Sequence, residues 1–260
     1  MDKSKIEHYG DELYNALITR TAVAPLTDRE ADITIEDAYQ IQQRMIQRRL
    51  DAGETIIGKK IGVTSKVVMD MLKVNQPDFG MMTSGMVFNE GESIDTSTMI
   101  APRAEAEVAF VLKSDLMGPG VTAADVLRAT DFVVPCFEIV DSRIQDWKIK
   151  SQDTVADNAS CGVLVLGGRR KSPADIDLAL AGMVLEKNGE IISTSTGAAV
   201  QGSPVNAVAW LANTLGNLGI GLKAGEVILS GSQSPLVPVK AGDSLVCTVG
   251  GLGGTSVRFI

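Results

Sequence analysis

The chain has 260 residues, 45% of them hydrophobic, which is enough to bury the core of one large domain or two small ones. Its 24 Lys and Arg against 32 Asp and Glu give a formal charge of -8, which argues against a general nucleic-acid-binding protein because phosphate contacts need clustered cations. The N-terminus lacks an apolar signal segment and no run of about 18 apolar residues occurs, so we expect a cytoplasmic protein that does not enter a membrane.

Two amphipathic helices are predicted near the N-terminus. The first runs from about residue 5 to 20, and the second follows Thr34, which can cap it, and ends at Gly53. We therefore expect a helical segment over residues 1–54 and a β-rich domain over residues 55–260. That domain should begin with a strand at 55–63, a short helix at 65–73 and a turn at 76–80.

The remainder is dominated by short apolar or alternating runs separated by Gly, Pro or Asn. Runs typical of strands occupy 103–112, 132–140, 161–168, 183–194, 226–231, 244–251 and 255–260. Asn188-Gly189 is a strong signal for a hairpin turn, and one clear helix begins at Pro204 and ends near Gly219. Strands and helices do not alternate, so the pattern favours an α+β fold with a mixed β-roll or barrel-like core over a parallel α/β sheet.

Three glutamates occur in two of these predicted strands. Glu105 and Glu107 are two residues apart and should project from one face of a strand, while Glu138 stands between apolar neighbours. Like charges at this spacing raise each other's pKa unless a cation lies between them. Oxygen ligands without His or Cys suit Mg²⁺, Mn²⁺ or Ca²⁺, so the glutamates are a candidate metal site. The alternatives are a solvated strand face or ion pairs with neighbouring Arg and Lys side chains.

Five short motifs follow one another along the chain. They are GKKIGVTS (58–65), QPDFG (76–80), RAEAEVAF (103–110), EIVDSRIQDW (138–147) and TVADNASCG (154–162). In order and spacing they resemble those of the 2-hydroxypenta-2,4-dienoate (2-oxopent-4-enoate) hydratases of meta-cleavage pathways. These enzymes belong to the hydratase/decarboxylase family of the fumarylacetoacetase superfamily. The resemblance covers essentially the whole chain and implies a β-rich catalytic domain of the fumarylacetoacetase type.

The resemblance implies a lyase that adds water to 2-hydroxypenta-2,4-dienoate, giving 4-hydroxy-2-oxopentanoate during degradation of aromatic compounds. In similar enzymes the glutamates matching Glu105, Glu107 and Glu138 hold Mg²⁺ or Mn²⁺, to which the 2-oxo acid substrate binds. Similar enzymes also form homo-oligomers, pentamers or decamers, and associate with the 4-oxalocrotonate decarboxylase that supplies their unstable dienol.

Proton transfer in such an enzyme would have to work without histidine in the β-rich domain, because the only histidine is His8. Lys60 and Asp78 are the candidates, and the lysine matching Lys60 is regarded as catalytic in the family. Burial in an apolar strand and a neighbouring dication would lower the pKa of Lys60 toward a useful range. Lys59 should face the other side of the strand and be structural or exposed. Asp78 follows a proline, and its alternative is an ordinary turn residue.

Three further residues are candidate substrate contacts. Asn158 and Ser160 could hydrogen-bond the substrate carboxylate, although Asn and Asp in such a turn equally often bond their own backbone. Arg143 could neutralise substrate charge, or it could belong to a structural ion-pair network with Asp141 and Asp146.

The closest alternative function is that of the 4-oxalocrotonate decarboxylases, which share the glutamate pair, the lysine strand and the DNAS motif. They lack an aspartate matching Asp78, and a hydratase needs such a group because it must deliver a proton and a water. A fumarylacetoacetase-type C–C hydrolase fits less well, since its better-known members use a histidine that this chain lacks.

Overall fold

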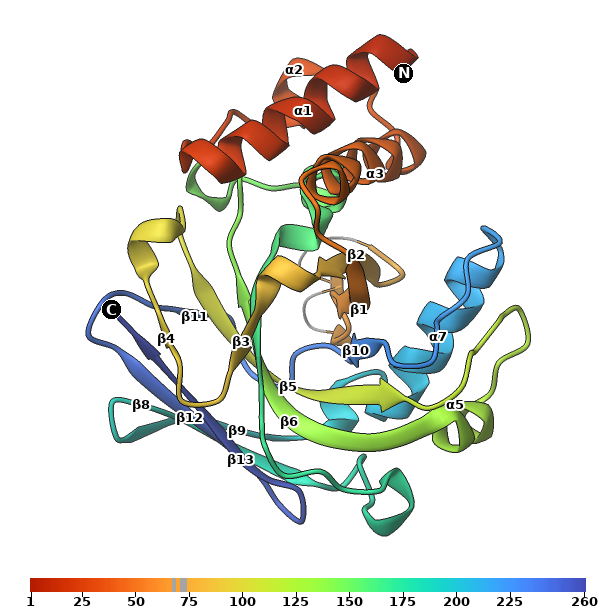
Figure 1. Ribbon diagram of the computed structural model, residues 1–260, viewed down its shortest axis with the longest axis vertical. Coiled ribbons are helices and arrows are strands. Elements are labelled where there is room, and N and C mark those ends of the chain that lie inside the picture. Colours follow the sequence, from red (N-terminus) through yellow and green to blue (C-terminus); the bar gives the residue numbers. More distant parts are fainter. Residues whose placement is uncertain (67–68, 71–73) are drawn as a thin grey trace.

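Three helices open the chain in the computed structural model, which describes residues 1–66, 69–70 and 74–260. They are α1 (Lys3–Thr19), α2 (Leu26–Arg29) and α3 (Ile35–Asp51). Thr34 caps α3 as predicted, because its hydroxyl accepts a hydrogen bond from the Asp37 N–H and the Asp37 carboxylate accepts one from the Thr34 N–H. Figure 1 shows these helices at one end of the molecule, above the β-sheets.

The larger sheet has eight strands and mixes parallel with antiparallel pairing. Its strands are β1 (Ile56–Gly62), β2 (Asp78–Thr83), β3 (Val87–Asn89), β5 (Arg103–Leu112), β6 (Thr130–Val140), β7 (Cys161–Leu166), β10 (Val227–Leu229) and β11 (Val237–Pro238). They are ordered β2-β1-β10-β5-β6-β7-β3, and β11 also pairs with β5. The β1–β10 and β3–β7 pairs are parallel and the other pairs antiparallel, so the predicted mixed sheet is confirmed.

The smaller sheet has five strands. From one edge to the other they are β4 (Ser93–Ile94), β13 (Gly253–Phe259), β12 (Ser244–Val249), β8 (Gly182–Lys187) and β9 (Glu190–Thr196). The hairpin turn between β8 and β9 lies at Asn188 and Gly189 as predicted, with φ of 55° and 84°, which is the left-handed backbone that such a turn requires.

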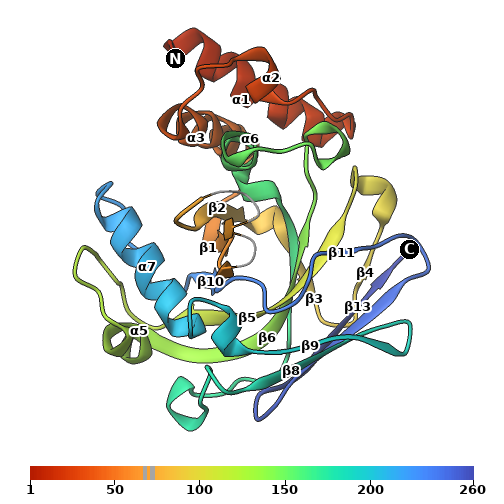
Figure 2. The ribbon, with the colours of Figure 1, turned by 180° about the vertical axis from the view of Figure 1, so that it is seen from behind.

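The main hydrophobic core lies between the two sheets and helix α7 (Pro204–Gly216). Phe110 of β5 and Phe137 of β6 point into it, where they join Leu245 of β12, Val257 of β13 and Leu211 of α7. Figures 1 and 2 both show the smaller sheet crossing beneath β5 and β6. The outer face of the larger sheet is therefore covered, and its inner face carries a smaller apolar cluster together with the polar residues of the site.

Helix α3 is tied to the larger sheet by one buried amide. The Gln42 side chain donates hydrogen bonds to the carbonyl oxygens of Phe79 in β2, at 2.9 Å, and Val155 in α6 (Ser151–Ala156), at 3.0 Å. Ile144 and Val155 also belong to the apolar cluster that α1 and α3 form with each other. The helical segment is thus packed onto the β-rich part, while the division at residue 54 stays a prediction.

The structure corrects three of the expected elements. α7 is not the only helix after the N-terminal segment, because the short helices α5 (Ala123–Ala129) and α6 are present. The predicted turn at 76–80 ends early, since β2 begins at Asp78. The larger sheet does not close into a barrel within the described residues: β2 and β3 are its two ends. The helix predicted at 65–73 falls largely on residues 67–68 and 71–73, which lie outside the described residues.

No helix among the described residues combines the length and the apolar character needed to cross a membrane.

Close packing of α1 on α3 depends on a glycine. A Cβ atom at Gly10 would lie 2.5 Å from Cβ of Arg44 and 2.9 Å from the carbonyl oxygen of Ile41. We expect Gly10→Val to lower the free energy of unfolding by about 1–3 kcal/mol, because the two helices would have to move apart. Urea unfolding measures the change, and Asn15→Val, at an exposed position of the same helix, is the control. Equal effects at both positions would contradict this packing.

Candidate functional site

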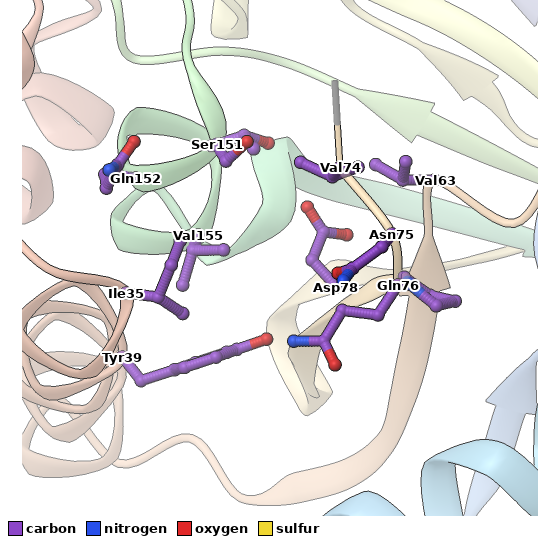
Figure 3. Close-up of a pocket in the computed structure, with 12 residues that line it drawn as sticks. Ile35, Tyr39, Val63, Val74, Asn75, Gln76, Asp78, Ser151, Gln152 and Val155 are labelled. Atoms are coloured by element: carbon purple, nitrogen blue, oxygen red, sulfur yellow. The ribbon is translucent and has the colours of Figure 1, made fainter. Parts of the chain in front are cut away.

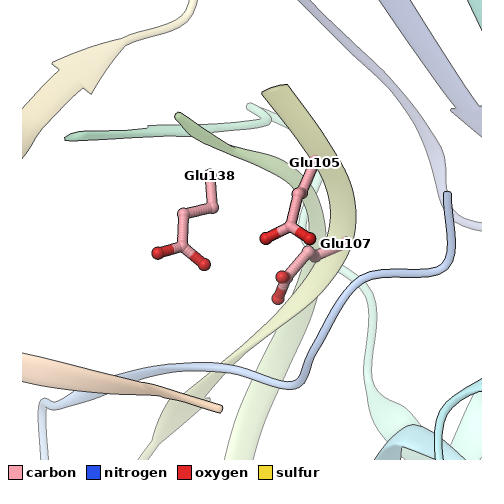
Figure 4. A group of neighbouring side chains, drawn as sticks. All are labelled: Glu105, Glu107 and Glu138. Carbon is pink, nitrogen blue, oxygen red and sulfur yellow. The ribbon is translucent and has the colours of Figure 1, made fainter. Parts of the chain in front are cut away.

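The three predicted glutamates meet on the inner face of the larger sheet. Glu105 in β5 lies directly opposite Glu138 in β6, and Glu107 follows two residues along β5 on the same face. One carboxylate oxygen of each residue lies within 4.8 Å of the others, and Figure 4 shows the three carboxylates turned toward one another. Glu107 and Glu138 are fully buried, whereas Glu105 keeps part of its surface open. The strand alternation inferred from the sequence is therefore confirmed.

Few of the oxygens of Glu107 and Glu138 accept a hydrogen bond from the described residues. Oε2 of Glu107 accepts one of 2.8 Å from the Gly231 N–H, whereas Oε1 of Glu107 and Oε2 of Glu138 have no partner there and Oε1 of Glu138 has only the ion pair with Lys60. Burial and the neighbouring Glu138 carboxylate raise the pKa of Glu105 to about 7, and the same two causes raise that of Glu107 well above its usual range. Buried polar groups are normally satisfied, so this oxygen-only donor set fits a divalent cation.

Lys60 contacts this cluster from β1, which is three strand positions away from β6 in the curled sheet. Its Nζ lies 3.1 Å from Oε1 of Glu138, and both side chains are buried. In a flat sheet the three strand spacings between β1 and β6 would separate their backbones by about 14 Å, so the contact depends on the curl that Figure 1 shows in β5 and β6.

The pKa of Lys60 differs from the expectation. Burial alone would lower it, but the carboxylates of Glu138, Glu105 and Asp78 outweigh burial and raise the pKa above its ordinary value. Lys59 faces the opposite side of β1, as predicted, and its Nζ lies 2.5 Å from Oε1 of Glu226. Lys59 is buried, so its structural alternative is confirmed and an exposed position is wrong.

Asp78 lies on the same inner face as Lys60. It pairs with Gly62 across β1 and β2, and its buried Oδ1 has no hydrogen-bond partner among the described residues. A Cβ atom at Gly62 would lie 2.2 Å from this oxygen and 3.6 Å from Nζ of Lys60. Burial raises the pKa of Asp78, although Lys60 opposes the shift. Gly62 therefore makes room for a second titratable group beside the lysine.

The DNAS motif forms a buried turn with an unusual backbone. Asn158, Ala159 and Ser160 all have positive φ, between 51° and 54°, a conformation that costs non-glycine residues about 1–2 kcal/mol each. The Asn158 amide accepts a hydrogen bond of 2.8 Å from the Met81 N–H and donates one of 2.9 Å to the Met81 carbonyl. The Asn158 side chain therefore bonds backbone groups, but they belong to β2 and not to its own turn. Oγ of Ser160 is buried without a hydrogen-bond partner in the described chain.

Arg143 is buried in a network of its own. Its Nε donates to Oδ1 of Asp157 at 2.5 Å, and the rest of the guanidinium donates to the carbonyl oxygens of Asp141, Asp157 and Cys161. Burial raises the pKa of Asp157 to about 6, although the Arg143 guanidinium opposes this shift. The structural alternative is thus supported, but its acid is Asp157 and not the carboxylates of Asp141 or Asp146.

Two features of the site were missed by sequence reasoning. One is the Gly231 N–H, which holds Glu107 and comes from the loop after β10. The other is a cavity of about 470 Å³ that reaches the site at Asp78 and is bounded by α3 and α6 (Figure 3). None of the three glutamates lines it. The sequence carried a weak signal for the first feature, in the glycine of SGSQS, and none for the second.

The chain is similar to two hydratases along most of its length. It is 64% identical over 221 residues to 2-hydroxypent-2,4-dienoate hydratase of Pseudomonas putida, covering 85% of this chain and 100% of the relative. It is 57% identical over 260 residues to 2-hydroxyhexa-2,4-dienoate hydratase of Comamonas testosteroni, covering 99% of this chain and 98% of the relative.

Solved structures and a family model agree with these relatives. The structure of 4-oxalocrotonate decarboxylase from Pseudomonas putida G7, complexed with magnesium and adipate, has a TM-score of 0.97 at 36% identity, covering 100% of this chain and 99% of that chain. The same enzyme has been solved with calcium and acetate. The family model described as fumarylacetoacetate (FAA) hydrolase C-terminal matches residues 59–259. Because this match spans most of the chain and the relatives align over nearly all of it, the chain belongs to the fumarylacetoacetate hydrolase family.

Proposed function

We propose that this protein is a metal-dependent hydratase that converts 2-hydroxypenta-2,4-dienoate, or its keto form 2-oxopent-4-enoate, into 4-hydroxy-2-oxopentanoate. The observation that carries the proposal is the placement of Asp78, a buried carboxyl whose Oδ1 has no hydrogen-bond partner in the described part of the chain, on the same sheet face as Lys60 and the glutamate cluster. The names of the relatives at 64% and 57% identity support the same reaction.

The carboxylates of Glu105, Glu107 and Glu138 would hold Mg²⁺ or Mn²⁺. When bound, the cation supplies Lewis-acid polarisation of the substrate's 2-oxo group. Glu107 is held by the Gly231 N–H and Glu138 by Lys60, so two of the carboxylates that would bind the cation have fixed positions.

Lys60 and Asp78 are the proposed proton-transfer groups. Conversion of the dienol into the conjugated ketone moves one proton from the 2-hydroxyl group to carbon 5, and addition of water at carbon 4 places a second proton on carbon 3. Lys60 holds a proton on Nζ beside Glu138, and the raised pKa of Asp78 allows its carboxyl to give or take one. Ser160, whose hydroxyl has no hydrogen-bond partner among the residues that the structure describes, is the proposed contact for the substrate carboxylate. Asn158 positions the turn that carries Ser160.

The alternative is 4-oxalocrotonate decarboxylation, favoured by the TM-score of 0.97 with that enzyme. A direct test is to follow freshly generated 2-hydroxypenta-2,4-dienoate by absorbance, with Mg²⁺ or Mn²⁺ and after chelation, beside a trial with 4-oxalocrotonate. We expect metal-dependent formation of 4-hydroxy-2-oxopentanoate. Release of CO₂ from 4-oxalocrotonate, with the dienol untouched, would assign the decarboxylase reaction instead.

The oligomeric state, a pentamer or decamer, and an association with 4-oxalocrotonate decarboxylase stay predictions that rest on the family resemblance.

The metal ligands can be tested by removing one charge. In Glu107→Gln the amide oxygen can still accept the hydrogen bond from Gly231, so we expect a folded protein that has lost both metal binding and turnover. Calorimetric titration with Mn²⁺ and a circular dichroism spectrum measure the two properties. Glu190→Gln, on the exposed strand β9, is the control. Normal metal binding in Glu107→Gln would remove Glu107 from the ligand set.

The proton-transfer groups should affect rate and not metal binding. We expect Lys60→Ala and Asp78→Asn each to lower kcat by about 10²- to 10⁴-fold, since this is the usual contribution of a positioned acid or base. Metal affinity should persist because all three glutamates remain. Lys113→Ala and Asp131→Asn, at exposed positions, are matched controls. An unchanged kcat in either site variant would rule out the role assigned to that residue.

Arg143 should act on stability. Arg143→Met leaves the Asp157 carboxylate buried without its cation, and we expect the free energy of unfolding to fall by about 3–5 kcal/mol. Urea unfolding measures the loss, and Arg143→Met/Asp157→Leu should recover part of it. If Arg143→Met kept wild-type stability but raised KM, Arg143 would be a substrate contact after all.

A further inference from the structure

The cavity of about 470 Å³ beside Asp78 has walls from parts of the chain that are far apart in sequence. Ile35 and Tyr39 come from α3, Val155 comes from α6, and Val63 follows the end of β1. Figure 3 shows their side chains around one space, with the Asp78 carboxylate at its edge. The cavity therefore has Asp78 at its edge, and its lining combines apolar side chains from α3, α6 and the end of β1 with polar ones, among them Gln152 and Thr154.

The wall formed by α3 is held in place by specific contacts. The ring of Tyr39 stacks on Phe79, the residue after Asp78, with 4.4 Å between ring centroids and 15° between ring planes. The Gln42 amide fixes the same helix to the carbonyls of Phe79 and Val155. A wall that is tied to both neighbouring elements can select a ligand by size, because it cannot move away cheaply.

Lys60 and Asp78 connect the glutamates with the cavity. Lys60 contacts Glu138, a Cβ atom at Gly62 would be near both Lys60 and Asp78, and Asp78 itself lines the cavity. A 2-oxo acid whose carboxylate end lies at the glutamates and whose reacting carbons lie near Lys60 and Asp78 would extend its far end into the cavity.

We propose that this cavity binds the alkyl group on carbon 5 of the dienoate substrate, and that Ile35 of the N-terminal helical segment limits its size. The proposal rests on the function proposed above. Ile35 and Tyr39 lie outside residues 59–259, the part that matches the family model, so the family's common sheet supplies the reacting groups and the preceding helices supply the substrate's far wall. Two relatives of the chain are named for dienoates that differ by one carbon.

Binding of saturated 2-oxo acids tests the proposal without turnover. Calorimetry with the Mg²⁺-loaded protein would compare 2-oxopentanoate, 2-oxohexanoate and 2-oxoheptanoate. In the wild type we expect each added methylene to tighten binding, by up to about fourfold if it is fully buried. Ile35→Phe should abolish the gain, and Ile35→Ala should keep or extend it. Gln40→Ala, at an exposed position of the same helix, is the matched control.

Turnover gives a second readout of the same selection. The ratio of kcat/KM for 2-hydroxyhexa-2,4-dienoate to that for 2-hydroxypenta-2,4-dienoate should fall in Ile35→Phe, by about 10-fold or more, and should not fall in Ile35→Ala. Thermal unfolding shows whether both variants are folded. If Ile35→Phe is not folded, the comparison is made between the wild type and Ile35→Ala.

The outcomes separate this proposal from the proposed function. A chain-length series that is the same in wild type and both Ile35 variants would overturn the alkyl site even if the dienoates are hydrated. If the series responds as expected while neither dienoate is hydrated, the proposed reaction fails, and the cavity still binds the alkyl end of a 2-oxo acid.

Discussion

Like charge buried on one face of a curled sheet is the constraint on which the rest of this structure depends. Glu105, Glu107 and Glu138 converge where water is largely excluded, and they face one lysine. Such a cluster is stable only with compensating positive charge or bound protons. The raised pKa values of Glu105 and Glu107 reflect a lack of compensating positive charge, which a divalent cation would supply. The curled sheet therefore brings the carboxylates together, and a bound divalent cation would offset the repulsion between them.

Strand periodicity was enough to predict which side chains share a face. It placed Glu105 beside Glu107 and separated Lys60 from Lys59, because alternation along a strand is a local property of the backbone. The same pattern also located most strands of the mixed fold. Periodicity does not report how strongly a sheet curls, and the curl is what brings Lys60 against Glu138.

The parts that could not be predicted depend on contacts distant in sequence. QPDFG has the composition of a turn, yet Asp78 begins a strand because it pairs with β1. Arg143 was assigned acids close in sequence, but burial selects Asp157, which also bonds the Arg143 backbone. The sign of the Lys60 pKa shift depended on the number of carboxylates around it. The cavity needed the packing of α3 on α6, for which a single sequence has no local signal.

The order of strands in the larger sheet also governs when the site can form. β10 lies between β1 and β5 in the sheet and pairs with both. Beside it, the ion pair of Lys59 with Glu226 joins residues 167 apart in the chain. The β5–β6 pair can assemble its three carboxylates from neighbouring segments, but Lys60 and the Gly231 N–H join them only after β10 is in place. The segments that carry the three carboxylates precede β10 and Gly231 along the chain, so during synthesis the N–H group that holds Glu107 is made after all three carboxylates.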